Sequence, residues 1–176
     1  MEVVQNRRKA LRLPDYDYSQ PGAYYVTVVT KQRYCLFGEV VCGEMRLNSF
    51  GRTVMECWDD LVRHYPSVQL DEFVVMPNHV HGIILLKEDL EISVGPGSAS
   101  VRSERHGLPE IVRAFKSFAA RRINELSATP GARVWQRNYY EHIVRNEREL
   151  RLIRRYVANN PLGWDKDPEN PAVQSH

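Results

Sequence analysis

The sequence predicts an α+β sandwich, in which helices cover an antiparallel sheet. Two apolar stretches, residues 72–76 and 79–86, flank a turn at Pro77-Asn78, so they are expected to pair as a hairpin. Along the chain, β-type and amphipathic stretches follow the order β-β-α-β-β-α-β-α, which differs from the repeated βαβ units of a doubly wound fold. With 176 residues and a hydrophobic fraction of 43%, the chain can bury the core of a single domain.

The first half of the chain contributes strands and one helix. β-Branched and aromatic residues dominate residues 23–30, which indicates a buried strand. Residues 35–47 predict short edge strands joined by a hairpin turn at Gly43-Glu44. Asn48 or Ser49 can cap the next helix, which is expected to run to about residue 64 because its apolar side chains have helical spacing.

The second half begins with residues 93–105, whose Gly, Ser and Pro content without periodicity predicts a flexible loop. A helix over residues 109–126 and an extended segment over residues 133–144 follow. The last helix begins near Asn146, where a glutamate stands at the third position, and it ends before Pro161. We expect all helices to lie over one face of the sheet.

The chain is divided here into a polar N-terminal arm (residues 1–20), a single domain (21–164) and a polar C-terminal tail (165–176). The longest apolar stretch, near residues 83–86, is far too short to span a membrane, and the N-terminus lacks the apolar segment of a secretory signal. Three cysteines without C-x-x-C spacing fit free thiols in a cytoplasmic protein.

The net charge of +2 conceals a strong asymmetry along the chain. Residues 102–155 carry 13 Lys and Arg against 6 acidic residues, a net charge of +7. This segment and the start of the next contain Trp135, Tyr139, Tyr140 and Tyr156. Arginine suits phosphate oxygens and aromatic rings stack on unpaired bases, so a nucleic-acid surface is one interpretation. The other interpretation is that these charged residues lie on solvated helix faces.

A candidate metal site comes from His79 and His81, which stand two apart at the start of a predicted strand. Both side chains should therefore lie on one face of the sheet, with Val80 on the other. Tyr156 and Asn160 lie one turn apart on the last helix, whose apolar face must pack on the sheet. If that helix covers the histidines, nitrogen and oxygen ligands meet beside a phenol. The alternatives are two unrelated histidines, a core tyrosine and a helix-capping asparagine.

Four stretches of the sequence resemble known families. Residues 75–83 (VMPNHVHGI) resemble the histidine–hydrophobic–histidine motif of the HUH single-strand DNA endonucleases. Residues 134–146 (VWQRNYYEHIVRN) and 156–161 (YVANNP) resemble the C-terminal signature of the REP-associated tyrosine transposases, and residues 115–117 also fit. The resemblance covers about residues 20–164. It implies a ferredoxin-like sandwich with a central antiparallel sheet and a C-terminal helix that carries the tyrosine.

The resemblance also implies a metal-dependent, transposase-like enzyme that nicks and joins single-stranded DNA at hairpins or repeats. Tyr156 would be the nucleophile and would form a 5′-phosphotyrosine intermediate without a nucleotide cofactor. The ligands implied for Mg²⁺ or Mn²⁺ are His79, His81 and Asn160. Tyr139 and Tyr140 are rival nucleophiles, but they lie in the extended segment rather than on the helix.

The implied partner is single-stranded or hairpin DNA. The protein is expected to be cytoplasmic and associated with the nucleoid, and no membrane partner is expected. The residues expected at the DNA are Arg113, Lys116, Arg121, Arg122, Trp135, Arg137, Tyr140, His142 and Arg145. Two other functions stay open, a domesticated repeat-DNA-binding protein with little or no strand transfer and an unrelated metal-dependent hydrolase. The sequence leaves open whether a monomer or a homodimer is active, and which DNA sequence is recognised.

Overall fold

The computed structural model describes residues 16–88 and 106–173, and the predicted flexible loop at residues 93–105 lies outside them. The strands are β1 (Gly22–Val29), β2 (Gly38–Val41), β3 (Glu44–Leu47), β4 (Val68–Val75), β5 (His79–Leu86) and β6 (Tyr140–Val144). The helices are α1 (Ser49–Asp59), α2 (Leu61–His64), α3 (Leu108–Leu126) and α4 (Glu147–Ala158), with 3-10 turns η1 (Lys31–Arg33) and η2 (Asn160–Lys166). Among these helices, none has the length and apolar character that a membrane crossing requires. The cysteines Cys35, Cys42 and Cys57 are free, as expected.

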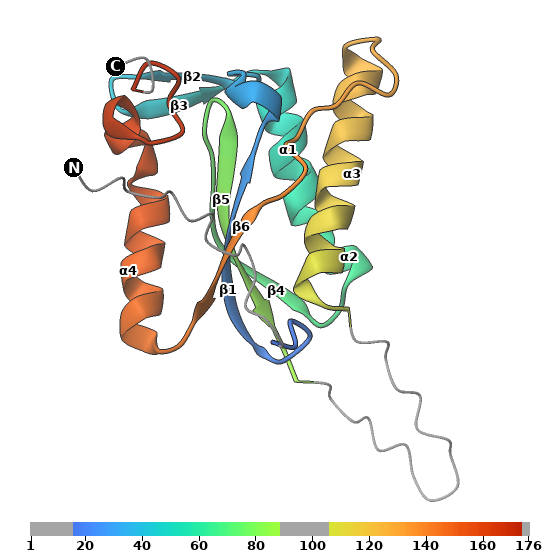
Figure 1. Cartoon of the computed structure of the whole chain (residues 1–176), viewed down its shortest axis with the longest axis vertical. Helices are drawn as coiled ribbons and strands as arrows, with labels where there is room; N and C mark the ends of the chain where they lie inside the picture. Colours follow the sequence, from blue (N-terminus) through green and yellow to red (C-terminus); the bar gives the residue numbers. More distant parts are fainter. Residues whose placement is uncertain (1–15, 89–105, 174–176) are drawn as a thin grey trace, which may run out of the picture.

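The central sheet has four strands in the order β4-β5-β1-β6, and each neighbouring pair is antiparallel (Figure 1). The predicted hairpin at Pro77-Asn78 joins β4 to β5. β1 lies between β5 and β6, so β6, the last strand along the chain, forms the edge of the sheet next to β1. This arrangement confirms the predicted α+β, ferredoxin-like sandwich. The β2–β3 hairpin forms a separate two-stranded sheet.

One face of the sheet carries the main hydrophobic core, which α1 and α3 cover (Figure 1). Alternate residues of β1 and β5 point into this core, as a strand period of two requires. Trp58 of α1 stacks on Phe73 of β4 with ring centroids 4.4 Å apart, and its edge meets Phe115 of α3 at 5.3 Å. These aromatic contacts fix both helices on the same face.

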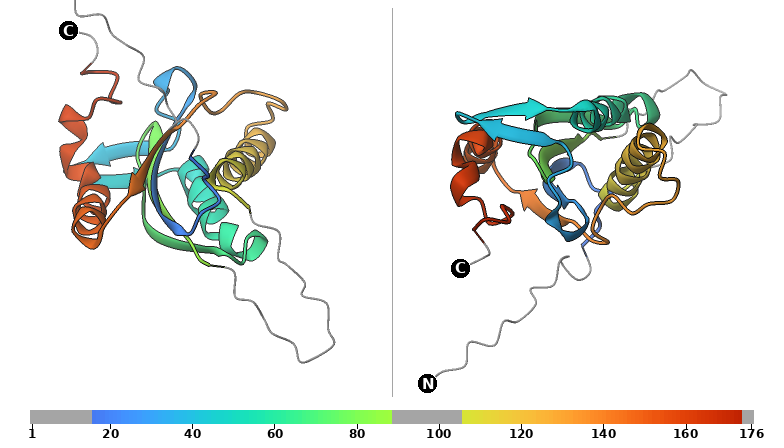
Figure 2. Two further views of the ribbon diagram at one scale, coloured as in Figure 1. Left: turned by 60° about the horizontal axis from the view of Figure 1, so that its bottom comes forward. Right: turned by 90° about the horizontal axis from the view of Figure 1, so that it is seen from above.

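Helix α4 covers the opposite face of the sheet, so the prediction that all helices lie over one face is wrong (Figures 1 and 2). Leu150 and Val157 of α4 form a small cluster there with Tyr25 and Ile83 of the sheet. Leu152 of the same helix is 57% exposed. The apolar stripe of α4 is therefore narrow, and the apolar area that it covers on this face is small.

The chain packs beyond both boundaries of the predicted domain within the described residues. Tyr18, from the predicted arm, is buried in the main core. In the predicted tail, the side chains of Asp167 and Asn170 are buried, and Asp167 Oδ1 accepts a hydrogen bond from the Glu169 backbone. We call residues 160–173 the C-terminal segment. Residues 1–15 and 174–176, the outer parts of the predicted arm and tail, lie outside the described residues.

Candidate metal centre and tyrosine site

His79 and His81 enter the site from the start of β5. Their side chains share the face that α4 covers, while Val80 lies in the main core, as strand periodicity predicted. The two Nε2 atoms are 3.0 Å apart, and both residues are buried. The strand therefore turns two imidazole nitrogens toward one point.

The other nitrogen of each imidazole faces the protein. His79 Nδ1 lies 2.8 Å from Asn78 Oδ1, and His81 Nδ1 lies 2.7 Å from the hydroxyl of Tyr25 and 2.9 Å from Thr27 Oγ1. Burial lowers the pKa of His79 to about 4, and burial together with the neighbouring His79 lowers the pKa of His81 well below its usual value. Both rings are therefore neutral at neutral pH, the form that binds metal.

Two side chains of the C-terminal segment, Asn160 and Asp167, lie beside His79. Asn160 Oδ1 is buried and has no hydrogen-bond partner within the described part of the chain. Asp167 Oδ2 lies 3.8 Å from His79 Nε2, and one ligand atom from each of His79, His81 and Asp167 falls within 4.8 Å of the others. Asp167 was not among the predicted ligands, because it stands in the stretch that was predicted to be a polar C-terminal tail.

The arrangement fits a divalent cation. At metal–nitrogen distances of about 2.1 Å, two nitrogens 3.0 Å apart subtend about 90°, which is the angle between neighbouring octahedral ligands. A cation would also supply the partner that the buried oxygen of Asn160 lacks, since an unsatisfied buried acceptor costs about 1–3 kcal/mol. His79, His81 and Asp167 could thus hold a metal ion, and Asn160, the third predicted ligand, lies in the same C-terminal segment as Asp167.

Tyr156 projects from α4 toward this centre and remains 48% exposed. Its ring centroid is 5.3 Å from that of His81 and 6.3 Å from that of Tyr25. Burial and the Asp167 carboxylate raise the pKa of the phenol, whereas hydrogen bonds with Asn160 and Tyr25 lower it. The phenol is therefore both accessible from solvent and in contact with the site.

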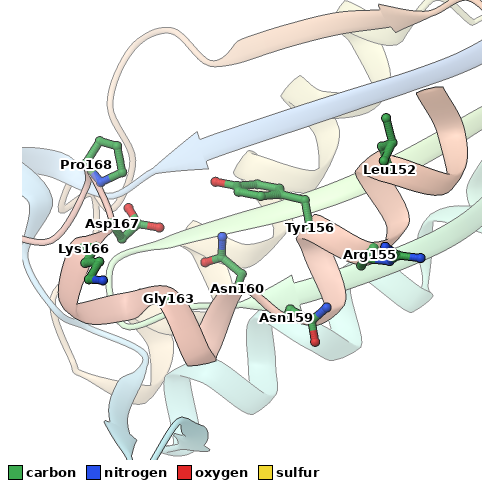
Figure 3. Close-up of a pocket in the computed structure, with 9 residues that line it drawn as sticks. All are labelled: Leu152, Arg155, Tyr156, Asn159, Asn160, Gly163, Lys166, Asp167 and Pro168. Carbon is green, nitrogen blue, oxygen red and sulfur yellow. The ribbon is translucent and has the colours of Figure 1, made fainter. Parts of the chain in front are cut away.

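A pocket of about 410 Å³ opens beside Tyr156. In Figure 3 the phenol of Tyr156 points toward Asp167, and Asn160 projects from the same side of the chain. Arg155 and Lys166, which were not predicted from the sequence, also line the pocket and place two positive charges against the single carboxyl group of Asp167. The pocket can thus bring an anionic group to the phenol.

The rival tyrosines have different surroundings. Tyr140 is 51% exposed on the face that α4 covers, where its ring meets the edge of Tyr25 at a centroid distance of 6.2 Å. Tyr139 is partly buried and packs against the main core on the other face. Of the three phenols, it is Tyr156 whose ring lies against His81 in the described contacts.

The α3 residues expected at the DNA lie on the face opposite the histidines (Figure 1). Lys116 donates to the backbone oxygens of Gln136 and Arg137, and burial lowers its pKa. Arg122 pairs with Asp60 of the neighbouring helix at 3.2 Å. The other two α3 residues that were expected at the DNA are Arg113 and Arg121. A strand held at Tyr156 would have to pass an edge of the sheet to reach them.

Of the remaining expected DNA contacts, Trp135 differs most from the expectation. Its indole is only 4% exposed and packs against Phe37 and Phe115, so no base can stack on it. Tyr140, His142 and Arg145 lie along β6 and the turn after it. His142 Nε2 is 2.7 Å from Glu149 Oε1 of α4, and Arg137 is exposed in the segment before β6.

No protein-family model matches the chain, but two relatives do. An uncharacterised protein of Haemophilus influenzae is 37% identical over 171 residues, which cover 92% of each chain. A second H. influenzae protein, provisionally named a REP-associated tyrosine transposase, is 22% identical over 147 residues, or 83% of this chain and 73% of its own length.

The fold also has a solved counterpart. A structure of a REP-associated tyrosine transposase bound to a REP hairpin matches with a TM-score of 0.56 and 18% identity, covering 86% of this chain and 72% of that one. The resemblance predicted from the sequence is thus confirmed. The chain belongs to one family with the 37% identical H. influenzae protein, and it has the fold of the solved REP-associated tyrosine transposase.

Proposed function

We propose that this protein cleaves and rejoins single-stranded DNA at hairpin or repeat sequences, with Tyr156 as the nucleophile. The observation that carries the proposal is the position of the Tyr156 phenol. Its ring lies 5.3 Å from that of the buried His81, between centroids, while 48% of the residue is open to solvent. A nucleophile in this position meets both a candidate metal centre and an incoming strand.

In the proposed reaction, the phenolic oxygen of Tyr156 attacks the scissile phosphorus. The new oxygen–phosphorus bond forms as the bond to O3′ breaks, which leaves a 5′-phosphotyrosine link and a free 3′-hydroxyl. The phenolic proton passes to solvent, and O3′ takes a proton from solvent. Attack by a 3′-hydroxyl on the same link reverses the step, so the enzyme can join strands without a nucleotide cofactor.

His79, His81, Asn160 and Asp167 would hold a divalent ion, Mg²⁺ or Mn²⁺. When bound, the ion would supply positive charge that polarises the scissile phosphate. Two imidazole ligands suit Mn²⁺ better than Mg²⁺, which prefers oxygen donors. Arg155 and Lys166 would neutralise phosphates beside the pocket.

The DNA surface would begin on the face that α4 covers. Tyr140 exposes its ring there, 6.2 Å from that of Tyr25, and an unpaired base could stack on it. Arg145 and Arg137 are exposed at the two ends of β6 and would contact phosphates. Hairpin DNA as the substrate is supported by the REP hairpin bound to the solved neighbour.

The test uses labelled single-stranded DNA with a short hairpin and a single-stranded flank, taken from repeats near the gene. Wild type, Tyr156→Phe and Tyr140→Phe are each incubated with Mn²⁺ or with EDTA and run on a denaturing protein gel. We expect a Mn²⁺-dependent DNA adduct with wild type and Tyr140→Phe, and none with Tyr156→Phe. The Tyr140 variant is the matched control, because it removes an equally exposed phenol from the same face.

Other outcomes would contradict the proposal in different ways. Hairpin-specific binding without any adduct would favour the repeat-DNA-binding protein. Cleavage that survives Tyr156→Phe and gives no adduct would favour the metal-dependent hydrolase. An adduct that disappears in Tyr140→Phe alone would move the nucleophile to β6.

A further inference from the structure

Asn78 occupies the turn between β4 and β5, directly before the first histidine, and it is fully buried. Its Nδ2 donates to the backbone oxygen of Arg33 at 3.1 Å and to that of Glu169 at 2.7 Å. Both amide hydrogens are therefore committed to carbonyl oxygens. The amide oxygen Oδ1, 2.8 Å from His79 Nδ1, can only accept, so His79 must donate from Nδ1.

This hydrogen bond decides which nitrogen of His79 can bind a cation. A neutral imidazole carries one proton, so a proton on Nδ1 leaves the lone pair on Nε2. Nε2 is the atom that lies 3.0 Å from His81 Nε2 and 3.8 Å from Asp167 Oδ2. The Asn78 amide thus turns the ligand atom of His79 toward the candidate metal centre.

His81 is held in a different way. Its Nδ1 meets the hydroxyls of Tyr25 and Thr27, and a hydroxyl can either donate or accept. Its tautomer can therefore change when a cation binds. The contrast makes His79 the ligand whose tautomer the protein fixes in advance.

The same amide also holds the segment that brings the carboxylate. The Glu169 carbonyl, which accepts from Asn78, lies two residues after Asp167, and the Glu169 backbone nitrogen donates to Asp167 Oδ1 at 2.7 Å. The Glu169 side chain pairs with Arg33, also at 2.7 Å. One buried side chain therefore joins the histidine strand to the C-terminal segment.

We propose that Asn78 is a positioning residue of the metal centre. It fixes His79 as an Nε2 ligand, and it holds the segment that carries Asp167 against the histidine strand. The proposal deepens the proposed function, on which its metal part rests, because it makes cation affinity depend on a residue that does not touch the cation. Hydrogen-bond partners of metal ligands commonly act in this way.

The tautomer is tested first, in the metal-free wild type. Long-range ¹H–¹⁵N correlation NMR of the histidine rings, assigned with His79→Ala and His81→Ala, reports which nitrogen is protonated. We expect His79 to be protonated on Nδ1. A proton on Nε2 of His79 would overturn the proposal, and this result does not depend on whether the protein binds metal or cuts DNA.

Metal affinity is tested next by titrating Mn²⁺ calorimetrically into wild type, Asn78→Ala, Asn78→Asp and Asn124→Ala. Asn124 is the matched control, since it is a buried asparagine of α3 that donates to the Ala132 oxygen at 2.9 Å. We expect Asn78→Ala to weaken Mn²⁺ binding about 10- to 100-fold, as the loss of such partners usually does. Asn124→Ala should bind like wild type.

The Asp variant separates the two roles, because it keeps an acceptor for His79 and loses the donor to Glu169. We expect it to preserve the Nδ1 tautomer and to bind Mn²⁺ more tightly than Asn78→Ala. Wild-type affinity in Asn78→Ala, or an equal loss in Asn124→Ala, would overturn the proposal. If wild type bound no Mn²⁺ while His79 carried its proton on Nδ1, the metal part of the proposed function would fail and the orienting role would stand.

Discussion

The two faces of the central sheet differ in what they bury. The face under α1 and α3 holds a continuous aromatic and aliphatic core, whereas the face under α4 holds a small apolar cluster beside the polar site. Strand β5 serves both, since Val80 and Ile84 point into the core while His79 and His81 point into the site. The difference indicates that the main core stabilises the fold from one face, and the proposed chemistry belongs to the other.

The largest expected effect is on stability and comes from the core face. Phe115→Ala removes a fully buried ring that contacts Trp58 and Trp135, and it should lower the free energy of unfolding by about 3–5 kcal/mol. Urea denaturation measures the change. Leu152→Ala, at an exposed position of α4, should stay within about 0.5 kcal/mol of wild type. Similar losses in both variants would mean that the faces contribute alike.

The next effect is expected from the site face. Mn²⁺ at 100 times its dissociation constant should raise the free energy of unfolding by about 2.7 kcal/mol, because it binds only the folded protein. His79→Ala should abolish this gain, while His64→Ala, at an exposed histidine of α2, should retain it. Thermal unfolding with and without Mn²⁺ tests both variants. A gain that persists in His79→Ala would place the ion elsewhere.

On β5, Gly82 sharpens the contrast, because it directly follows His81 but faces the core. A Cβ atom at Gly82 would lie 2.5 Å from the Trp58 ring, so Gly82→Ala should cost about 1–3 kcal/mol through overpacking. The control is Gly163→Ala, where nothing lies within 4 Å of the added atom. Chemical denaturation measures the free energy of unfolding of both variants. A neutral Gly82→Ala would show that the core face is loosely packed at β5.

The smallest effect concerns the attachment of α4. Arg154 of α4 binds Asp71 of β4 and holds the pKa of that carboxyl below its usual value. A lowered folded pKa adds stability above the unfolded pKa, and this is lost as the pH falls through the folded one. Because the arginine is partly exposed, we expect about 1 kcal/mol or less. Asp71→Asn should flatten the loss of stability on acidification below about pH 4, which urea denaturation over a pH series measures.

Local periodicity was sufficient to predict several features of the site. The spacing of His79 and His81 gave their common face, and Asn146 caps α4 by accepting from the Glu149 backbone, as expected. The face that α4 covers could not be predicted, because an apolar stripe indicates that a helix packs but not on which side. Asp167 was missed for a related reason. Its segment is anchored by contacts of Glu169 with Asn78 and Arg33, which stand 91 and 136 positions earlier in the chain.

Charge and aromatic content were less informative about the DNA surface. The sequence interleaves arginines with aromatic residues around Trp135, yet the indole lies in the core and donates to the Lys116 carbonyl oxygen at 3.1 Å. Composition reports which side chains are present but not which of them reach solvent. Tyr140 and Tyr156 were both expected at the site, but only the structure shows that their side chains are exposed.

The central claim, that Tyr156 forms a covalent link to DNA, is tested most directly by mass spectrometry. Wild-type protein is incubated with hairpin DNA and Mn²⁺, digested with nuclease and protease, and its peptides are sequenced. We expect a nucleotide attached through its 5′-phosphate to the peptide that contains Tyr156. Attachment to Tyr139 or Tyr140, or cleaved DNA with no modified peptide, would contradict the account.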